Sequence, residues 1–101
     1  MVNGKLKIVI DDQAKLHLRQ AYNYIKKDSL QNAKKVREKI LSSIKDLIKK
    51  PEVHAPDKYK IKNDGSYRAY EVNRYRISYH LSKEQITIIR IRHTKMNPLE
   101  Y

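Results

Sequence analysis

The spacing between apolar residues changes once along the chain, and this change restricts the folds that the chain can adopt. From Gln13 to about Lys49, apolar residues recur at intervals of three and four, as they do on one face of a helix. From Tyr67 to Arg92, apolar and polar residues mostly alternate, as they do in a strand with one buried face. The sequence therefore predicts helices first and a sheet afterwards.

The helical region divides into two at a short polar break. Asp11 and Asp12 can cap the first predicted helix, Gln13–Lys27, because short polar side chains accept hydrogen bonds from the free N–H groups of a helix start. Ser29 can cap the second, Leu30–Lys49. A connection this short predicts an antiparallel helical hairpin. The residues expected on the buried faces are Ala14, Leu18, Ala21, Tyr22 and Ile25 in the first helix, and Ala33, Val36, Ile40, Ile44, Leu47 and Ile48 in the second.

Three strands are predicted in quick succession, and their short connections determine how they pair. The strands are Tyr67–Val72, Tyr75–Leu81 and Gln85–Arg92. Asn73-Arg74 forms the first tight turn, because Asn tolerates a positive φ, and Ser82–Glu84 forms the second. Connections this short force neighbouring strands into an antiparallel meander.

The remaining segments complete the predicted topology. Lys5–Ile10 alternates, so a short strand is expected before the first helix. Pro51–Ser66 is polar and ends in the turn cluster Asn63–Ser66, and whether Tyr59–Ile61 is extended stays open. The order β-α-α-β-β-β predicts an α+β fold with residues 1–101 as a single domain. In this fold, a helical hairpin packs on one face of a small, mainly antiparallel sheet.

Strict alternation assigns each strand residue to one face of the predicted sheet. The helices can cover only one face, so the other is expected to stay open, with apolar residues and arginines mixed on it. Such a face suits an acidic partner with an apolar stripe. Pro98 favours an extended Asn97, so the C-terminal segment is expected to cross or edge this face. In Tyr75–Leu81, one face is expected to carry Tyr75, Ile77, Tyr79 and Leu81, and the other face Arg76, Ser78 and His80. In Gln85–Arg92, one face is expected to carry Ile89 and Ile91, and the other face Ile86, Ile88, Arg90 and Arg92.

The chain carries a large positive charge. Lys and Arg number 23 and Asp and Glu 11, so the net charge is 23 − 11 = +12. This charge either attracts a polyanion or an acidic protein, or is a solubilising lysine coat. A coat explains the lysine-rich helices better than the C-terminal third, because arginine is the planar donor used at interfaces and phosphate sites. The arginines of that third are Arg68, Arg74, Arg76, Arg90 and Arg92.

The last strand leads into a cluster of cations that can act jointly on a phosphate or a carboxylate. The cluster consists of Arg90, Arg92, His93 and Lys95. Two interpretations of His93 are open. It is either a strand-end residue hydrogen-bonded to the backbone, or a general acid or base beside two cations.

Arg76 and Tyr101 also allow two interpretations each. Arg76 either forms an ion pair with Glu71 or Glu84, or takes part in a functional site on the polar face of its strand. Tyr101 is either a frayed terminus or a residue that stacks on a base or donates its hydroxyl.

Several classes of function are disfavoured. The four histidines are too dispersed for a metal site, no nucleotide-binding loop or catalytic triad order is present, and no cofactor is expected. The chain has no cysteine, which excludes disulfides and thiolate chemistry. Met1–Ile10 lacks the features of a signal peptide, and no segment approaches the roughly 20 apolar residues of a membrane span. We therefore expect a cytoplasmic protein without membrane contact.

Segments spread over nearly the whole chain follow the pattern of one known superfamily. They are Tyr24-Ile25, Ser29, Ala33, Leu47 and Pro51 in the helical part, Tyr67–Val72 and Tyr75–Tyr79 in the strands, and Arg92–Asn97 at the end. In these segments and in their order, the chain resembles the RelE/ParE superfamily of toxins from type II toxin–antitoxin modules. The helical part and the ending are more similar to the ParE branch, the plasmid stabilisation proteins.

The resemblance implies a bacterial toxin that is neutralised by a co-expressed acidic antitoxin and reaches operator DNA only through that antitoxin. ParE members inhibit DNA gyrase and have no known catalytic step, and this is the function that we favour. The expected target-binding residues are then Arg90, Arg92, His93, Lys95 and Met96.

RelE-like members instead cut mRNA on the ribosome with basic residues, and this is the alternative. RelE-like members carry an arginine just past the last strand, but Thr94 and Lys95 occupy that stretch here. The catalytic residues of the alternative would be Arg76, Arg92, His93 and Tyr101.

Overall fold

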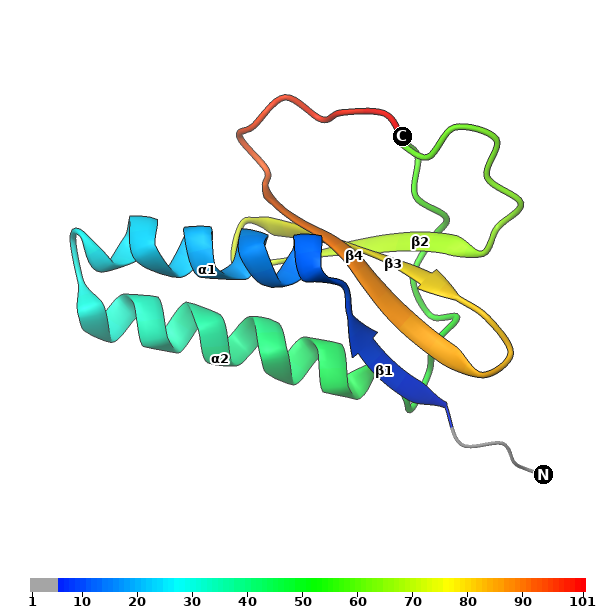
Figure 1. Cartoon of the computed structure of the whole chain (residues 1–101), viewed down its shortest axis with the longest axis horizontal. Coiled ribbons are helices and arrows are strands. Elements are labelled where there is room, and N and C mark those ends of the chain that lie inside the picture. Colours follow the sequence, from blue (N-terminus) through cyan, green and yellow to red (C-terminus); the bar gives the residue numbers. More distant parts are fainter. Residues whose placement is uncertain (1–5) are drawn as a thin grey trace.

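A computed structural model describes residues 6–101, in which two helices pack on a four-stranded sheet (Figure 1). The predicted element order and the α+β class are confirmed. Lys5, the first residue of the predicted N-terminal strand, lies outside the described residues. The elements are β1 (Lys7–Ile10), α1 (Asp12–Lys26), α2 (Leu30–Asp46), β2 (Tyr67–Val72), β3 (Tyr75–Leu81) and β4 (Gln85–His93).

The strands lie in the order β1-β4-β3-β2. The predicted antiparallel meander of β2, β3 and β4 is confirmed, and β1 adds to it in parallel beside β4. The pairing of β1 begins with Lys7 opposite Gln85 and ends with Ile10 opposite Ile88. Beyond Ile88, β4 therefore continues with β3 on one side and no strand on the other within residues 6–101.

The sequence signals for helix starts and for the hairpin turn are confirmed. The Asp11 carboxylate accepts from the Gln13 N–H at 3.4 Å, and the Ser29 hydroxyl oxygen accepts from the Asn32 N–H at 3.0 Å. The β2–β3 turn has φ of 49° at Asn73 and 69° at Arg74, as in a type I′ hairpin.

The end of α2 differs from the prediction. The helix ends at Asp46, and the chain turns at once instead of continuing to Lys49. Leu47 still reaches the core, but Ile48 is turned outwards and is 49% exposed. The prediction that Ile48 is buried is therefore wrong, because helical periodicity no longer applies after the helix ends.

A β-bulge in β4 changes which residues face the helices. Ser78 lies opposite Arg90 but Tyr79 lies opposite Ile88, so Ile89 is an extra residue without a cross-strand partner. The side-chain alternation shifts by one at this point. The expectation that Ile86 and Ile88 share a face with Arg90 and Arg92 is therefore wrong, because strict alternation assumes an unbroken ladder. Instead Ile86, Ile88 and Ile91 all lie in the core.

The core lies between the helices and the inner face of the sheet. It contains Ala14, Ala21, Val36, Ile40, Ile44, Leu47, Tyr75, Ile77, Tyr79, Ile86, Ile88 and Ile91. The open face consequently carries the arginines without the isoleucines that were expected there. No helix among residues 6–101 is long and apolar enough to cross a membrane.

The loop between α2 and β2 is held against the sheet at both ends. The Tyr79 hydroxyl donates to the Pro51 carbonyl at 2.7 Å, and burial raises the pKa of Tyr79 to about 12. Asp57 N–H donates to the Tyr67 carbonyl at 2.7 Å, so the extended part of the loop lies around Pro56 rather than at Tyr59–Ile61. The predicted turn before β2 is confirmed, with Gly65 at φ 97°.

Shortening two isoleucines tests this description of the core. Ile40 is fully buried, whereas Ile48 is half exposed although both were expected in the core. Ile40→Ala should lower the free energy of unfolding by about 2–5 kcal/mol, because it removes buried area and leaves a cavity. Ile48→Ala should change it by less than about 0.5 kcal/mol. Urea unfolding followed by circular dichroism measures both, and equal losses would contradict the observed end of α2.

Candidate functional site

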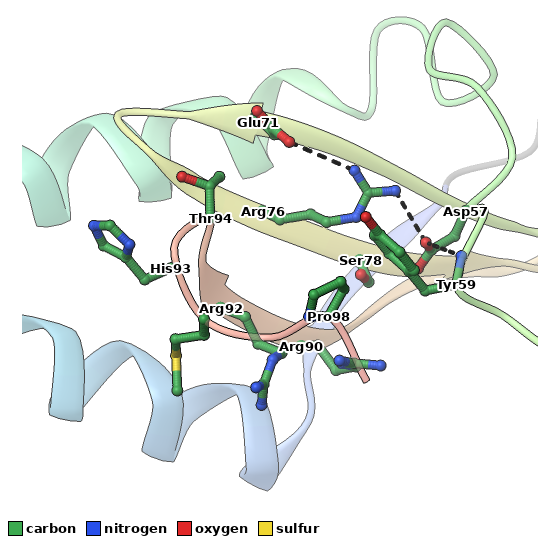
Figure 2. A pocket seen from close by; sticks show the side chains of 11 residues that line it. Asp57, Tyr59, Glu71, Arg76, Ser78, Arg90, Arg92, His93, Thr94 and Pro98 are labelled. Atoms are coloured by element: carbon green, nitrogen blue, oxygen red, sulfur yellow. Dashed lines mark hydrogen bonds and ion pairs between the residues drawn. The ribbon is translucent and has the colours of Figure 1, made fainter. Parts of the chain in front are cut away.

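Three arginines from β3 and β4 gather on the face of the sheet away from the helices. Arg76 lies directly opposite Arg92, and Arg90 is next to this pair on the same face because the bulge precedes it. They line a cavity of about 120 Å³ that is closed by the segment after β4 (Figure 2). The full lining is Asp57, Tyr59, Glu71, Arg76, Ser78, Arg90, Arg92, His93, Thr94, Met96 and Pro98.

Asp57 is the buried carboxylate of this site, and it accepts from three donors. Its Oδ1 accepts from Arg76 Nη2 at 3.0 Å and from the Tyr59 N–H at 3.1 Å. Its Oδ2 accepts from the Tyr101 hydroxyl at 2.5 Å. Asp57 is only 2% exposed, and a buried carboxylate is tolerated when donors of this kind replace its water.

The sequence analysis missed Asp57, because it lies in a loop, 19 positions before its arginine partner. The ion pair predicted between Arg76 and Glu71 is present at 3.7 Å. The other suggested partner, Glu84, is not the one used, since Asp57 takes that place.

The same contacts shift two pKa values in opposite directions. Burial acts to raise the pKa of Asp57, but hydrogen bonds from Tyr101, Tyr59 and Arg76 outweigh it, and the net pKa is lowered. Burial raises the pKa of Tyr101, and its hydrogen bond to the Asp57 carboxylate raises it further. The pair is thus an ionised carboxylate with a protonated phenol as its donor.

Tyr101 is anchored, so its interpretation as a frayed terminus is wrong. Its N–H donates to the Tyr59 carbonyl at 3.0 Å, and its carbonyl accepts from the Ile61 N–H at 2.6 Å. The Arg90 guanidinium lies 4.4 Å from the centre of its ring. Tyr59 and Ile61 lie at least 40 positions before Tyr101, which is why local reasoning at a chain end could not find them.

The C-terminal segment crosses the open face, as predicted from its extended character. Arg92 Nη2 donates to the Asn97 carbonyl at 3.1 Å, and Arg90 Nη1 donates to the Leu99 carbonyl at 2.7 Å. Burial lowers the pKa of Arg90, and the charge of Arg92 lowers it further. Figure 1 shows the segment running from the end of β4 to the loop before β2.

His93 lines the same cavity as Arg92, but its ring packs on the core residue Tyr75. It pairs with Tyr75 in the ladder, and its ring meets the Tyr75 ring edge-on at 5.0 Å. Its Nδ1 accepts from the Lys95 N–H at 3.0 Å. In Figure 2 its ring points away from the arginines. The geometry agrees with the interpretation of His93 as a strand-end residue hydrogen-bonded to the backbone.

A second hollow lies between α1 and the unpaired edge of β4, with a volume of about 520 Å³. We call it the α1–β4 groove. His17 lies on its wall, and its Nδ1 accepts from the Ile91 N–H at 3.2 Å, an amide that faces the side where β1 has ended. Burial, and then the charges of Arg92 and Arg90, lower the pKa of His17, so the ring stays a neutral acceptor. The groove is lined by His17, Gln20, Ala21, Tyr24, Tyr75, Ile91, Arg92, His93, Lys95 and Met96.

The predicted site residues thus divide between two surfaces. Arg76 and Arg90 belong to the cavity, whereas Lys95 belongs to the α1–β4 groove; Arg92, His93 and Met96 line both. Tyr101 reaches the cavity through Asp57. Within residues 6–101, His, Asp and Glu side chains form no group of three that could hold a metal ion.

The lowered pKa of Asp57 predicts a dependence of stability on pH. Above its unfolded pKa of about 3.9 the ionised carboxylate stabilises the fold, and this stabilisation is lost as the pH falls through the lower folded pKa. The free energy of unfolding should therefore fall more steeply between pH 5 and pH 2 in the wild type than in Asp57→Asn. Asp28→Asn, in the exposed turn between the helices, is the control and should keep the wild-type slope. Equal slopes for the wild type and Asp57→Asn would contradict the role given to Asp57.

Comparison with solved structures identifies the fold. The chain is similar to a structure described as the chromosomal ParDE TA system from P. aeruginosa, with a TM-score of 0.73 and 16% identity over 89% of this chain and 97% of that one. It is also similar to the YoeB dimer from Staphylococcus aureus, with a TM-score of 0.55 and 20% identity over 89% of this chain and 98% of that one. Similarities at such low identity show a common fold. No curated protein matches the sequence.

A family-level sequence comparison goes further than the fold. The family described as the ParE toxin of type II toxin–antitoxin system, parDE, matches residues 8–98. This range includes every helix, nearly all of the sheet and the segment after β4 as far as residue 98. The chain therefore belongs to the ParE toxin family of the RelE/ParE superfamily, as the resemblance in sequence implied.

Proposed function

We propose that this toxin inhibits DNA gyrase by binding it and is neutralised by a cognate antitoxin. The observation that carries the proposal is that the residues needed for RNA cleavage are engaged in structural contacts. Arg76 is held by Asp57 and Glu71, and the His93 ring packs on Tyr75. A binding function needs only exposed surface, and the segment after β4 offers it.

The proposed gyrase contact centres on Lys95 and Met96. Both are exposed, and the Met96 side chain is 52% exposed although it is large and apolar. Arg92 and His93 lie beside them on the wall of the α1–β4 groove. A flexible apolar side chain among cations is a common composition at protein interfaces, because the apolar part supplies affinity and the charges supply orientation. Arg90, the remaining predicted contact, lies beneath the C-terminal segment.

The α1–β4 groove is the surface that we assign to the antitoxin. Its floor is apolar, with Ala21, Tyr75 and Ile91, and Tyr24 stands at its side with 68% of its surface exposed. Lys95 adds positive charge, within a protein of net charge +12. An acidic segment with an apolar stripe complements both features. The P. aeruginosa relative is described as a ParDE system, which supports an antitoxin partner.

A pair of double variants tests the gyrase contact. Lys95→Glu with Met96→Ser should raise the concentration needed to inhibit supercoiling by purified gyrase about tenfold or more, because both changes fall at the centre of the proposed contact. Lys45→Glu with Ile48→Ser makes the same charge change and replaces an equally exposed apolar residue at the end of α2. This control should inhibit like the wild type. Equal inhibition by all three proteins would show that the target surface lies elsewhere.

One observation favours the alternative of ribosome-dependent mRNA cleavage. Arg76 and Arg92 line one cavity and can together contact a phosphate, and Tyr101 is joined to Arg76 through Asp57. In this alternative, Arg76→Ala with His93→Gln should lower the rate of mRNA cleavage in translating extracts about 10²–10⁴-fold. Arg74→Ala, in the exposed turn next to β3, is the matched control. The gyrase proposal instead predicts no cleavage by any of these proteins, and cleavage by the wild type would overturn it.

A further inference from the structure

Residues 97–101 cross the arginine cavity as a narrow strap. Residues 97–100 are exposed on their outer side, and Tyr101 is the only residue of the strap that is partly buried. The strap is tied by its backbone to Arg90 and Arg92, and at its end to Tyr59, Ile61 and Asp57. Few apolar contacts hold a segment of this kind, so its position depends mainly on hydrogen bonds.

The hydrogen bonds between the strap and the sheet join charged guanidinium donors to neutral carbonyl acceptors. Arg92 donates to the Asn97 carbonyl and Arg90 to the Leu99 carbonyl. Neither arginine has a carboxylate within 4.0 Å among residues 6–101, in contrast to Arg76. An oxyanion adds its own negative charge to a hydrogen bond from a guanidinium, and it can accept two parallel N–H groups from one arginine, which a single carbonyl oxygen does not. Carbonyl oxygens are therefore weak ligands for this pair of arginines.

Two of the arginines that line the cavity also have a buried nitrogen without an acceptor. Arg76 Nε and Arg92 Nε are buried and make no hydrogen bond within the described part of the chain. Arg68 Nε, which does not line this cavity, is in the same state, so these nitrogens do not by themselves indicate a ligand in the cavity. The cavity of about 120 Å³ is several times what one water needs, and its charged lining sums to 3 − 2 = +1, from Arg76, Arg90 and Arg92 against Asp57 and Glu71.

We propose that the strap is a displaceable internal ligand of the arginine cavity. In the closed state, Arg90 and Arg92 donate to the carbonyls of Leu99 and Asn97, and in the open state an oxyanion replaces these carbonyls as the acceptor. The Tyr101–Asp57 hydrogen bond stabilises the closed position of the strap, and we call this hydrogen bond the catch. The inference rests on the proposed function for its consequence, since opening the strap frees the guanidinium groups of Arg90 and Arg92 from the strap carbonyls for an anionic group of the partner. The opening itself does not depend on gyrase.

The catch has a second effect that follows from its geometry. The two Asp57 oxygens are divided between Arg76 and Tyr101, so the closed strap and the position of Arg76 are held by one carboxylate. When Tyr101 leaves, Asp57 keeps Arg76 but loses a donor that lowered its pKa. Opening therefore frees Arg90 and Arg92 while Arg76 remains paired.

The test compares pyrophosphate binding by the wild type, Tyr101→Phe and Tyr22→Phe. Tyr22 is a matched control, because the Arg37 guanidinium lies 4.4 Å from its ring, as Arg90 lies from the Tyr101 ring. Titration is followed by NMR of the arginine Nε–H signals in ¹⁵N-labelled protein. Loss of the catch raises the open fraction, so Tyr101→Phe should bind about tenfold more tightly than the wild type and Tyr22→Phe. The signals of Arg90 and Arg92 should shift.

A truncation after Met96 removes the strap and provides a second measurement. It should bind pyrophosphate at least as tightly as Tyr101→Phe, and glutarate, used as a dicarboxylate probe, shows whether carboxylates also serve as the oxyanion. Equal pyrophosphate affinities for Tyr101→Phe and Tyr22→Phe, or shifts that omit Arg90 and Arg92, would overturn the proposal. Because no gyrase is present in this assay, a negative result here and a negative supercoiling result remain separate findings.

Discussion

The site depends on the need to satisfy one buried carboxylate. Removing the Asp57 charge from water costs several kcal/mol, and the fold recovers this only by bringing three donors to it. These donors come from the loop before β2, from β3 and from the last residue of the chain. The loop, the sheet and the C-terminus therefore adopt their positions together, and the arginine cavity is the space that they enclose.

The bulge at Ile89 has the next largest effect, because it decides which side chains meet. It keeps three isoleucines of β4 in the core and turns Arg90 and Arg92 towards Arg76. It also leaves His93 with Tyr75, on the side of the α1–β4 groove. Cations that are adjacent in sequence are thus distributed over two surfaces. His93 lines the arginine cavity as well, but its ring packs on Tyr75 and its Nδ1 accepts from the Lys95 N–H, and both of these partners line only the α1–β4 groove.

Arg92 connects the two surfaces, since it lines both the arginine cavity and the α1–β4 groove. In the proposed function, the groove receives the antitoxin and the segment after β4 contacts gyrase. A ligand in the groove would then change the surroundings of a residue that also holds the strap. If a ligand in the groove moves Arg92, the two binding events are coupled energetically, and this coupling is reciprocal. The two surfaces lie close together because a chain of this size has one core and one open face.

Local sequence signals determined the helices, their caps at Asp11 and Ser29, the hairpin turn at Asn73-Arg74 and the order of the elements, because each depends on neighbouring residues. They also placed three arginines on the open face and the tail across it. Only the tertiary structure decided the parallel pairing of β1 with β4, the bulge, the outward position of Ile48 and the network around Asp57. Asp57 meets its side-chain partners across 19 and 44 positions of sequence, and the bulge is visible only in the register between β3 and β4. Periodicity contains no information about such contacts, since it describes only the face on which a residue lies when the ladder is regular.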